Sequence, residues 1–265
     1  MEILGGIEYA LVTLLGLLIG SFLNVVVHRV PRRESIIYPA SHCPQCGHIL
    51  RFWENIPVLS WLILRGRCRD CGGFIAWRYP ALELLTAIFS LVVAWQWGFR
   101  WSLLPALIFT WALLALALID LETQLLPDRI TKPGMLLGLL LNASALLGSG
   151  VALTSPLNAL LGIVLGYGSL WLLATGYLKM TGRHGMGGGD LKLLGMIGAW
   201  LGWQAVFLTL FIAAISGGVV AIAMLLSGKG RDYAIPFGPY LALGGWLMLL
   251  WPKAIIGGYL HFLGS

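Results

Sequence analysis

The chain has 265 residues, of which 58% are hydrophobic and only 11% are charged. A soluble protein of this length would carry roughly a quarter charged residues, so an ordinary soluble domain is excluded. The net charge of +6 does not indicate nucleic-acid binding, because the positive residues lie between long apolar runs, where orientation in a membrane explains them. We therefore expect an all-α polytopic protein embedded in a lipid bilayer.

The first apolar run, about residues 7–27, is expected to be a retained membrane helix and not a cleaved signal peptide. Glu2 and Glu8 lie at its start with no Lys or Arg, and no small-residue cleavage site follows. Arg29 and Arg32 come directly after it. This distribution of charge predicts an N-terminus outside the cytoplasm and a cytoplasmic segment from residue 29 onward.

We predict about eight transmembrane helices, near residues 7–27, 80–98, 101–120, 133–149, 156–178, 191–203, 205–226 and 237–260. Alternation from an outside N-terminus leaves 28–79, 121–132, 179–190 and 227–236 in the cytoplasm. Most of the 17 Lys and Arg residues fall in these segments, as expected for cytoplasmic loops. Only Arg100 and Lys253 fall towards the other face. The run 191–226 is divided at Gly202 because one undivided span would place Lys229 and Arg231 outside.

Two acidic residues stand at the ends of apolar runs, where an ionisable group is costly and usually functional. Asp120 ends the run WALLALALID, and Asp190 follows the glycines of GMGGGD, which begins at Gly185. The predicted topology brings both to the cytoplasmic edge of the membrane. Two neighbouring carboxylates cannot both ionise easily, so one keeps a proton while the other activates a water. We therefore predict an aspartyl protease site, in which the acid and base roles are not assigned.

Residues around Asp190 are predicted to support this site. Gly187 and Gly189 would adopt backbone conformations closed to other residues and let a substrate strand approach. The start of a helix at Asp190 would favour its ionised form, and Lys192 would add to this effect. A simpler interpretation is that Asp190 only caps a helix.

Two other acids compete with Asp120 for the first catalytic position. Asp128 follows Leu-Leu-Pro and precedes an apolar run, so helix capping explains it. Glu122 is nearer water. Asp120, which is flush with the apolar run, has the weakest structural explanation and is the better candidate.

All four cysteines fall within residues 28–79, as the pairs Cys43-x2-Cys46 and Cys68-x2-Cys71, each followed by glycine. This spacing predicts a zinc knuckle in which four thiolates close the shell of a structural ion. Disulfides are the alternative, but a cytoplasmic location disfavours them. His42 and His48 flank the first pair as possible spare ligands or as ordinary surface residues.

The motifs of the chain resemble a known family. The segments IDLETQLLPD and GMGGGDLKLLGMIGAWLGW, which contain Asp120 and Asp190, are similar to the two catalytic motifs of the type IV prepilin peptidases, a G-x-G-D family of membrane aspartyl proteases. The stretches Gly20–Arg33, Asn55–Cys68 and Arg78–Ala87 also resemble that family, in the same order. Presenilin-type proteases share G-x-G-D, but they have Tyr-Asp at the first aspartate, where this chain has Ile-Asp.

The resemblance implies a bifunctional enzyme of the bacterial inner membrane. Its substrates would be type IV prepilins or type II secretion pseudopilins, cut after a glycine at the cytoplasmic face, with the new N-terminus then methylated from S-adenosylmethionine. The implied parts are a first transmembrane helix (1–27), a cytoplasmic zinc-binding loop associated with methyl transfer (28–79) and a membrane peptidase domain (80–265).

The sequence leaves several points open. It does not locate the S-adenosylmethionine site. The apolar residues of the loop either line a cofactor pocket or lie on the membrane surface: Phe52, Trp53, Ile56, Val58, Trp61 and Leu62. Oligomeric state and the particular pilins are also undetermined. Two other classes of protein remain as alternatives, a proton-coupled transporter with paired aspartates and a membrane binding protein with a zinc module.

Overall fold

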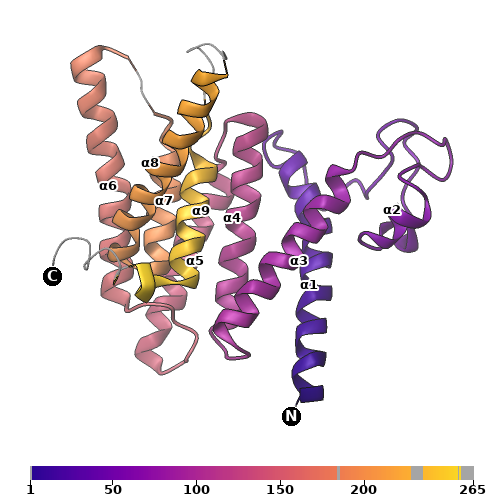
Figure 1. The fold of residues 1–265 in the computed structure, drawn as a ribbon, viewed down its shortest axis with the longest axis horizontal. Coiled ribbons are helices and arrows are strands. Elements are labelled where there is room, and N and C mark those ends of the chain that lie inside the picture. The colour runs from indigo at the N-terminus through magenta and orange to yellow at the C-terminus, as the bar shows by residue number, and fades with distance from the viewer. Residues whose placement is uncertain (1, 184–185, 228–234, 256, 258–265) are drawn as a thin grey trace. The chain divides into compact units, whose positions relative to one another are not determined.

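The computed structural model describes residues 2–183, 186–227, 235–255 and 257 (Figure 1). Within these ranges the regular structure is helical, which confirms the predicted class. The described residues also form two isolated antiparallel β-bridges, between His42 and Ile49 and between Arg67 and Phe74. The α-helices are α1 Glu2–Arg29, α2 Leu59–Ile63, α3 Arg78–Trp97, α4 Leu103–Thr123, α5 Asp128–Ala143, α6 Pro156–Thr181, α7 Gly188–Leu201, α8 Trp203–Leu226 and α9 Gly238–Leu250.

Six of the described helices are long and apolar enough to cross a membrane: α1, α3, α4, α5, α6 and α8. The predicted total of eight spans is therefore not confirmed, although each predicted span coincides with a separate helix. The two that fall short are α7, with 14 residues, and α9, with 13 described residues. Lys229 and Arg231, which supported the predicted orientation, and the end of the last predicted span lie outside the described residues.

The predicted division of 191–226 is present as a break between α7 and α8. Gly202 has φ +87° and separates the two helices. A left-handed φ of this kind is open to glycine at little cost and interrupts a helix.

The chain divides into two compact units, Met1–Arg100 and Trp101–Ser265. In the first unit, α1 packs against α3, and the cysteine-bearing segment connects them. The Asn24 side chain in α1 donates a 3.2 Å hydrogen bond to the carbonyl of Tyr79, which fixes the start of α3 against α1.

In the second unit, α7 is surrounded by α5, α6, α8 and α9. Its residues 193–200 are all buried, as expected of a helix that is apolar on every side. A Cβ atom added at Gly162 of α6 would lie 2.2 Å from the carbonyl oxygen of Gly198, so glycine at this position lets α6 and α7 pack closely.

The C-terminal end of α7 is held by side chains from neighbouring helices. Buried Asn142 donates hydrogen bonds to the carbonyls of Ala199 and Trp200 and accepts from the N–H groups of Leu153 and Thr154. This uses the full hydrogen-bonding capacity of an Asn side chain at 1% exposure. The position of α7, which begins with the glycine-aspartate motif, is therefore fixed at its far end.

Candidate functional site

Asp120 lies near the end of α4, and its side chain is buried, with 5% of the residue exposed. Its Oδ2 accepts a 2.9 Å hydrogen bond from the main-chain N–H of Gly238, the first residue of α9. By contrast, Glu122 is exposed. A buried carboxylate requires compensating donors, and Asp120 has one from the backbone.

Asp190 lies in the first turn of α7 and is half-buried. The Asp120 and Asp190 carboxylates are close enough for the charge of one to act on the other. Both belong to the second unit. The structure thus brings together the two acids that the sequence singled out, from helices α4 and α7.

The glycines before Asp190 act differently from the prediction. Neither Gly187, with φ −77°, nor Gly189 has a positive φ. The prediction that both adopt backbone conformations closed to other residues was therefore wrong. Gly189 instead allows a close approach. A Cβ atom there would lie 2.7 Å from Cβ of Leu126, in the segment between α4 and α5.

Lys192 has a different partner from the one predicted. Its Nζ donates to Oδ1 of Asp128 at 2.5 Å, and Lys132 contacts the other oxygen of Asp128 at 2.7 Å. Asp128 makes no side-chain cap to α5, so the predicted capping role was also wrong. This ion-pair cluster connects the start of α5 with the start of α7.

Gly238 is a contributor to the site that the sequence analysis missed. A Cβ atom at this position would lie 2.6 Å from Oδ2, 3.0 Å from Cγ and 3.2 Å from Cβ of Asp120. The glycine is therefore required for the main chain of α9 to reach the carboxylate. The signal in the sequence is a glycine that lies between two prolines, Pro236 and Pro239, but its partner Asp120 is far away in the chain.

The four cysteines of the first unit form one cluster, with Sγ atoms all within 4.8 Å of one another. Cys43 lies 3.9 Å from Cys71, and Cys46 lies 3.9 Å from Cys68. These separations match a tetrahedron of sulfur ligands at about 2.3 Å from a zinc ion, whose edges measure roughly 3.8 Å. They are far too long for disulfide bonds, and all four cysteines are free.

The two cysteine pairs have the same local backbone. In each, the first cysteine accepts from a glycine N–H at 3.0 Å and donates its own N–H at 2.8 Å, to His48 in one pair and Gly73 in the other. The glycines, Gly47 and Gly72, have φ near +70°, which confirms the predicted tight turns. The N–H of Cys46 lowers the pKa of the Cys43 thiol to about 7 against the effect of burial. Against the N–H of His48, burial and the other three thiols raise the pKa of Cys46 to about 12, so Cys43 is the first of this pair to ionise.

His48 is not a spare ligand in this arrangement, because both of its ring nitrogens contact carboxylates. Its Nε2 lies 3.1 Å from Glu54, and its Nδ1 lies 2.8 Å from Asp70. The hydrogen bond to Glu54 raises the pKa of His48. The pKa of Glu54 is lowered, chiefly by the Arg51 N–H at 2.9 Å and next by His48.

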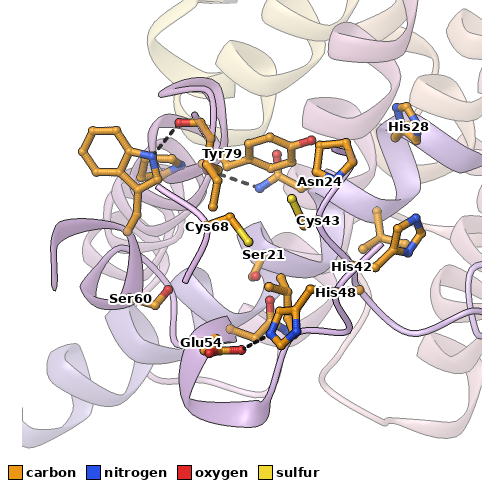
Figure 2. A pocket seen from close by; sticks show the side chains of 18 of the residues that line it. Ser21, Asn24, His28, His42, Cys43, His48, Glu54, Ser60, Cys68 and Tyr79 are labelled. Atoms are coloured by element: carbon orange, nitrogen blue, oxygen red, sulfur yellow. Dashed lines mark hydrogen bonds and ion pairs between the residues drawn. The ribbon is translucent and has the colours of Figure 1, made fainter. Parts of the chain in front are cut away.

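A cavity of about 430 Å³ lies in the first unit beside the cysteines (Figure 2). Its wall includes residues of α1, the cysteine segment, α2 and the start of α3. Among the apolar loop residues proposed as a cofactor pocket, Trp61 is in this wall, while Phe52, Ile56 and Leu62 are exposed.

Two protein-family models match the chain. Residues 14–97 match the bacterial peptidase A24 N-terminal domain, and residues 107–222 match the type IV leader peptidase family. The two matches fall separately on the two compact units.

Individual proteins match almost the whole chain. The prepilin leader peptidase/N-methyltransferase of Pseudomonas aeruginosa is 45% identical to this chain, over 95% of this chain and 93% of that protein. The protein of the same name from Pseudomonas putida is 44% identical, over 96% of this chain and 94% of its own length. The protein of that name from Neisseria gonorrhoeae is 42% identical over 94% of this chain and 92% of its own length. No solved structure matches the chain.

Proposed function

Because this chain belongs to the type IV leader peptidase family and is a prepilin leader peptidase and N-methyltransferase, we propose that Asp120 and Asp190 are its catalytic pair. The observation that carries this proposal is a buried carboxylate held by a main-chain donor on α4, with a second carboxylate on α7 within range of its charge. A buried acid with a single backbone donor has a large desolvation cost, and such acids are concentrated at functional sites.

The proposed mechanism uses the two acids and one water. One carboxylate keeps a proton while the other accepts a proton from the water, which attacks the carbonyl of the scissile peptide. The protonated acid then supports the developing oxyanion. The Gly238 N–H holds Oδ2 of Asp120, so this carboxylate presents its second oxygen in a fixed direction.

The substrates proposed are type IV prepilins or type II secretion pseudopilins with a short basic leader before an apolar helix. The multi-pass chain would lie in the bacterial inner membrane with its N-terminus outside. The active site and the cysteine segment would then face the cytoplasm, as the distribution of Lys and Arg favours. Residues 80–265 would perform proteolysis, and residues 28–79 would belong to methyl transfer.

Two further groups are proposed to act with these residues. Zinc would be held by Cys43, Cys46, Cys68 and Cys71, where it would stabilise the fold and, with a closed shell of four thiolates, have no position for a reacting water. S-adenosylmethionine would supply the methyl group for the new N-terminus.

The test uses purified protein in detergent with a prepilin that carries its leader. Asp120→Asn and Asp190→Asn are compared with Glu122→Gln, an exposed acid in the same turn as Asp120. Each Asn variant should lose cleavage by about 10²–10⁴-fold or more, while Glu122→Gln remains active. If either Asn variant cuts the prepilin at the wild-type rate, the assigned pair is wrong.

A further inference from the structure

The cavity of the first unit is lined by residues of that unit alone, whereas both aspartates belong to the second unit. Its volume, about 430 Å³, is in the range of sites that hold small-molecule ligands of drug size. The relatives carry two activities in their name, and a second reaction requires a second site. The first unit therefore has a cavity whose ligand has not been assigned.

The wall of this cavity carries buried charges of both signs. Glu54 and Glu83 are each 7% exposed, and so is Arg29. The Arg29 guanidinium donates to the carbonyls of Ser35 at 3.1 Å and Pro39 at 2.7 Å. In the described part of the chain, no carboxylate forms an ion pair with Arg29. A ligand that carries both a carboxylate and a cation would complement such a wall.

The two buried acids differ in what already satisfies them. Only one oxygen of the Glu54 carboxylate is hydrogen-bonded. Its Oε2 accepts from Arg51 and His48, whereas its Oε1 has no hydrogen bond among the described residues, with the Arg69 guanidinium 3.7 Å away. A buried carboxylate oxygen without a donor is uncommon and indicates a missing partner.

Glu83 is held in place by the main chain of the cysteine-bearing segment. It stands on α3, and its Oε2 accepts a 2.7 Å hydrogen bond from the N–H of Val58. Val58 has φ +60°, which is strained for a β-branched residue. Strain of this kind is found where a local geometry serves function. Glu83 thus has a fixed position, held by the Val58 N–H and by Ser21, and no ion pair with a cation is present among the described residues.

We propose that this cavity binds a sulfonium methyl donor of the S-adenosylmethionine class, with Glu83 as the acid that balances its positive charge and Arg29 as the group that receives its carboxylate. The inference rests on the proposed methyltransferase function. When bound, the donor supplies a methyl group: the lone pair of a neutral amine forms the new N–C bond, the electrons of the S–C bond return to sulfur, and the secondary ammonium releases one proton to water.

The experiment compares the wild-type full-length protein with Glu83→Gln and Glu8→Gln. Glutamine keeps an acceptor for the Val58 N–H but removes the charge, and Glu8 is an exposed acid on α1 that gives the same change of charge. Equilibrium dialysis measures binding of labelled S-adenosylmethionine and of S-adenosylhomocysteine, whose sulfur is neutral. Zinc content, prepilin cleavage and methylation of a pre-cut pilin are measured on the same samples.

The charge on sulfur makes the outcome specific. Glu83→Gln should weaken S-adenosylmethionine binding by roughly tenfold or more, the effect of losing one charged contact, and S-adenosylhomocysteine binding much less. Cleavage and zinc content should match the wild type, and Glu8→Gln should change nothing. Equal loss of both ligands, or loss of zinc or cleavage, would assign Glu83 a structural role and overturn the proposal, as would wild-type donor binding.

Failure of the proposed function gives a different result. If Asp120→Asn or Asp190→Asn cleaves prepilin normally while the donor results are as expected, the proposed catalytic pair is wrong but the cavity assignment stands. If the wild type performs both reactions and Glu83→Gln methylates normally, only the cavity assignment is wrong.

Discussion

Gly238→Ala should remove most of the cleavage activity although Gly238 has no side chain to take part in chemistry. The new Cβ would lie 2.6 Å from Oδ2 of Asp120 and 3.0 Å from its Cγ, whereas an ordinary contact needs roughly 3.4 Å or more. The carboxylate or the start of α9 must therefore move by close to 1 Å. A misplacement of this size costs about 10²-fold in rate.

The effect on stability should be smaller than the effect on rate. Overpacking costs about 1–3 kcal/mol, offset by about 0.5–1 kcal/mol from replacing glycine with alanine in a helix. The control is Gly168→Ala in α6, where an added Cβ meets nothing within 4 Å. It should keep full activity and gain slight stability.

The assay measures kcat/KM for leader cleavage, with thermal unfolding and methylation of a pre-cut pilin on the same samples. We expect Gly238→Ala to lose cleavage and keep methylation, because the cavity proposed for the donor belongs to the other unit. Cleavage within threefold of the wild type would refute the reasoning that the Gly238 main chain positions Asp120.

Three further predictions concern the supports of the two units. Asn142→Ala should lower the free energy of unfolding by about 3 kcal/mol, since several buried groups lose their partner, and denaturant unfolding in detergent would measure this loss. The double variant Cys43→Ser, Cys46→Ser should lose the zinc detected by mass spectrometry, whereas prepilin cleavage continues at a measurable rate. Lys192→Met should keep cleavage within about threefold, because Lys192 pairs with Asp128; a double-mutant cycle with Asp128→Asn should give a coupling of about 0.5–1 kcal/mol. A large loss of cleavage in Lys192→Met would instead support the role at Asp190 that the sequence suggested.

Local patterns predicted the features that depend on neighbours in the sequence. The apolar run before Asp120 indicated burial, and the paired spacing of Cys43 and Cys46 indicated a knuckle, because both depend on a few adjacent residues. The break at Gly202 also followed from local composition and charge. Such features are set by helix length, turn geometry and hydrophobicity.

Contacts between distant segments could not be predicted in this way. The donor to Asp120 is a main-chain N–H, which every residue except proline has, so the glycine of PFGP, residues 236–239, did not by itself identify Asp120 as its partner. Lys192 could pair with any nearby acid, and only the placement of α5 beside α7 selects Asp128. The position of Glu83 in a cavity wall depends on how the cysteine segment returns to α3, which no local pattern specifies.

The enclosure of α7 has a consequence for how the enzyme responds to its lipids. At about 1.5 Å per residue, its 14 residues extend about 21 Å, well short of a hydrocarbon layer of about 30 Å. Because α7 is covered by neighbouring helices, it does not have to match that thickness itself. A thicker or thinner bilayer would act first on the outer helices, such as α6 and α8, which have exposed apolar faces. The position of Asp190 is thereby insulated from hydrophobic mismatch.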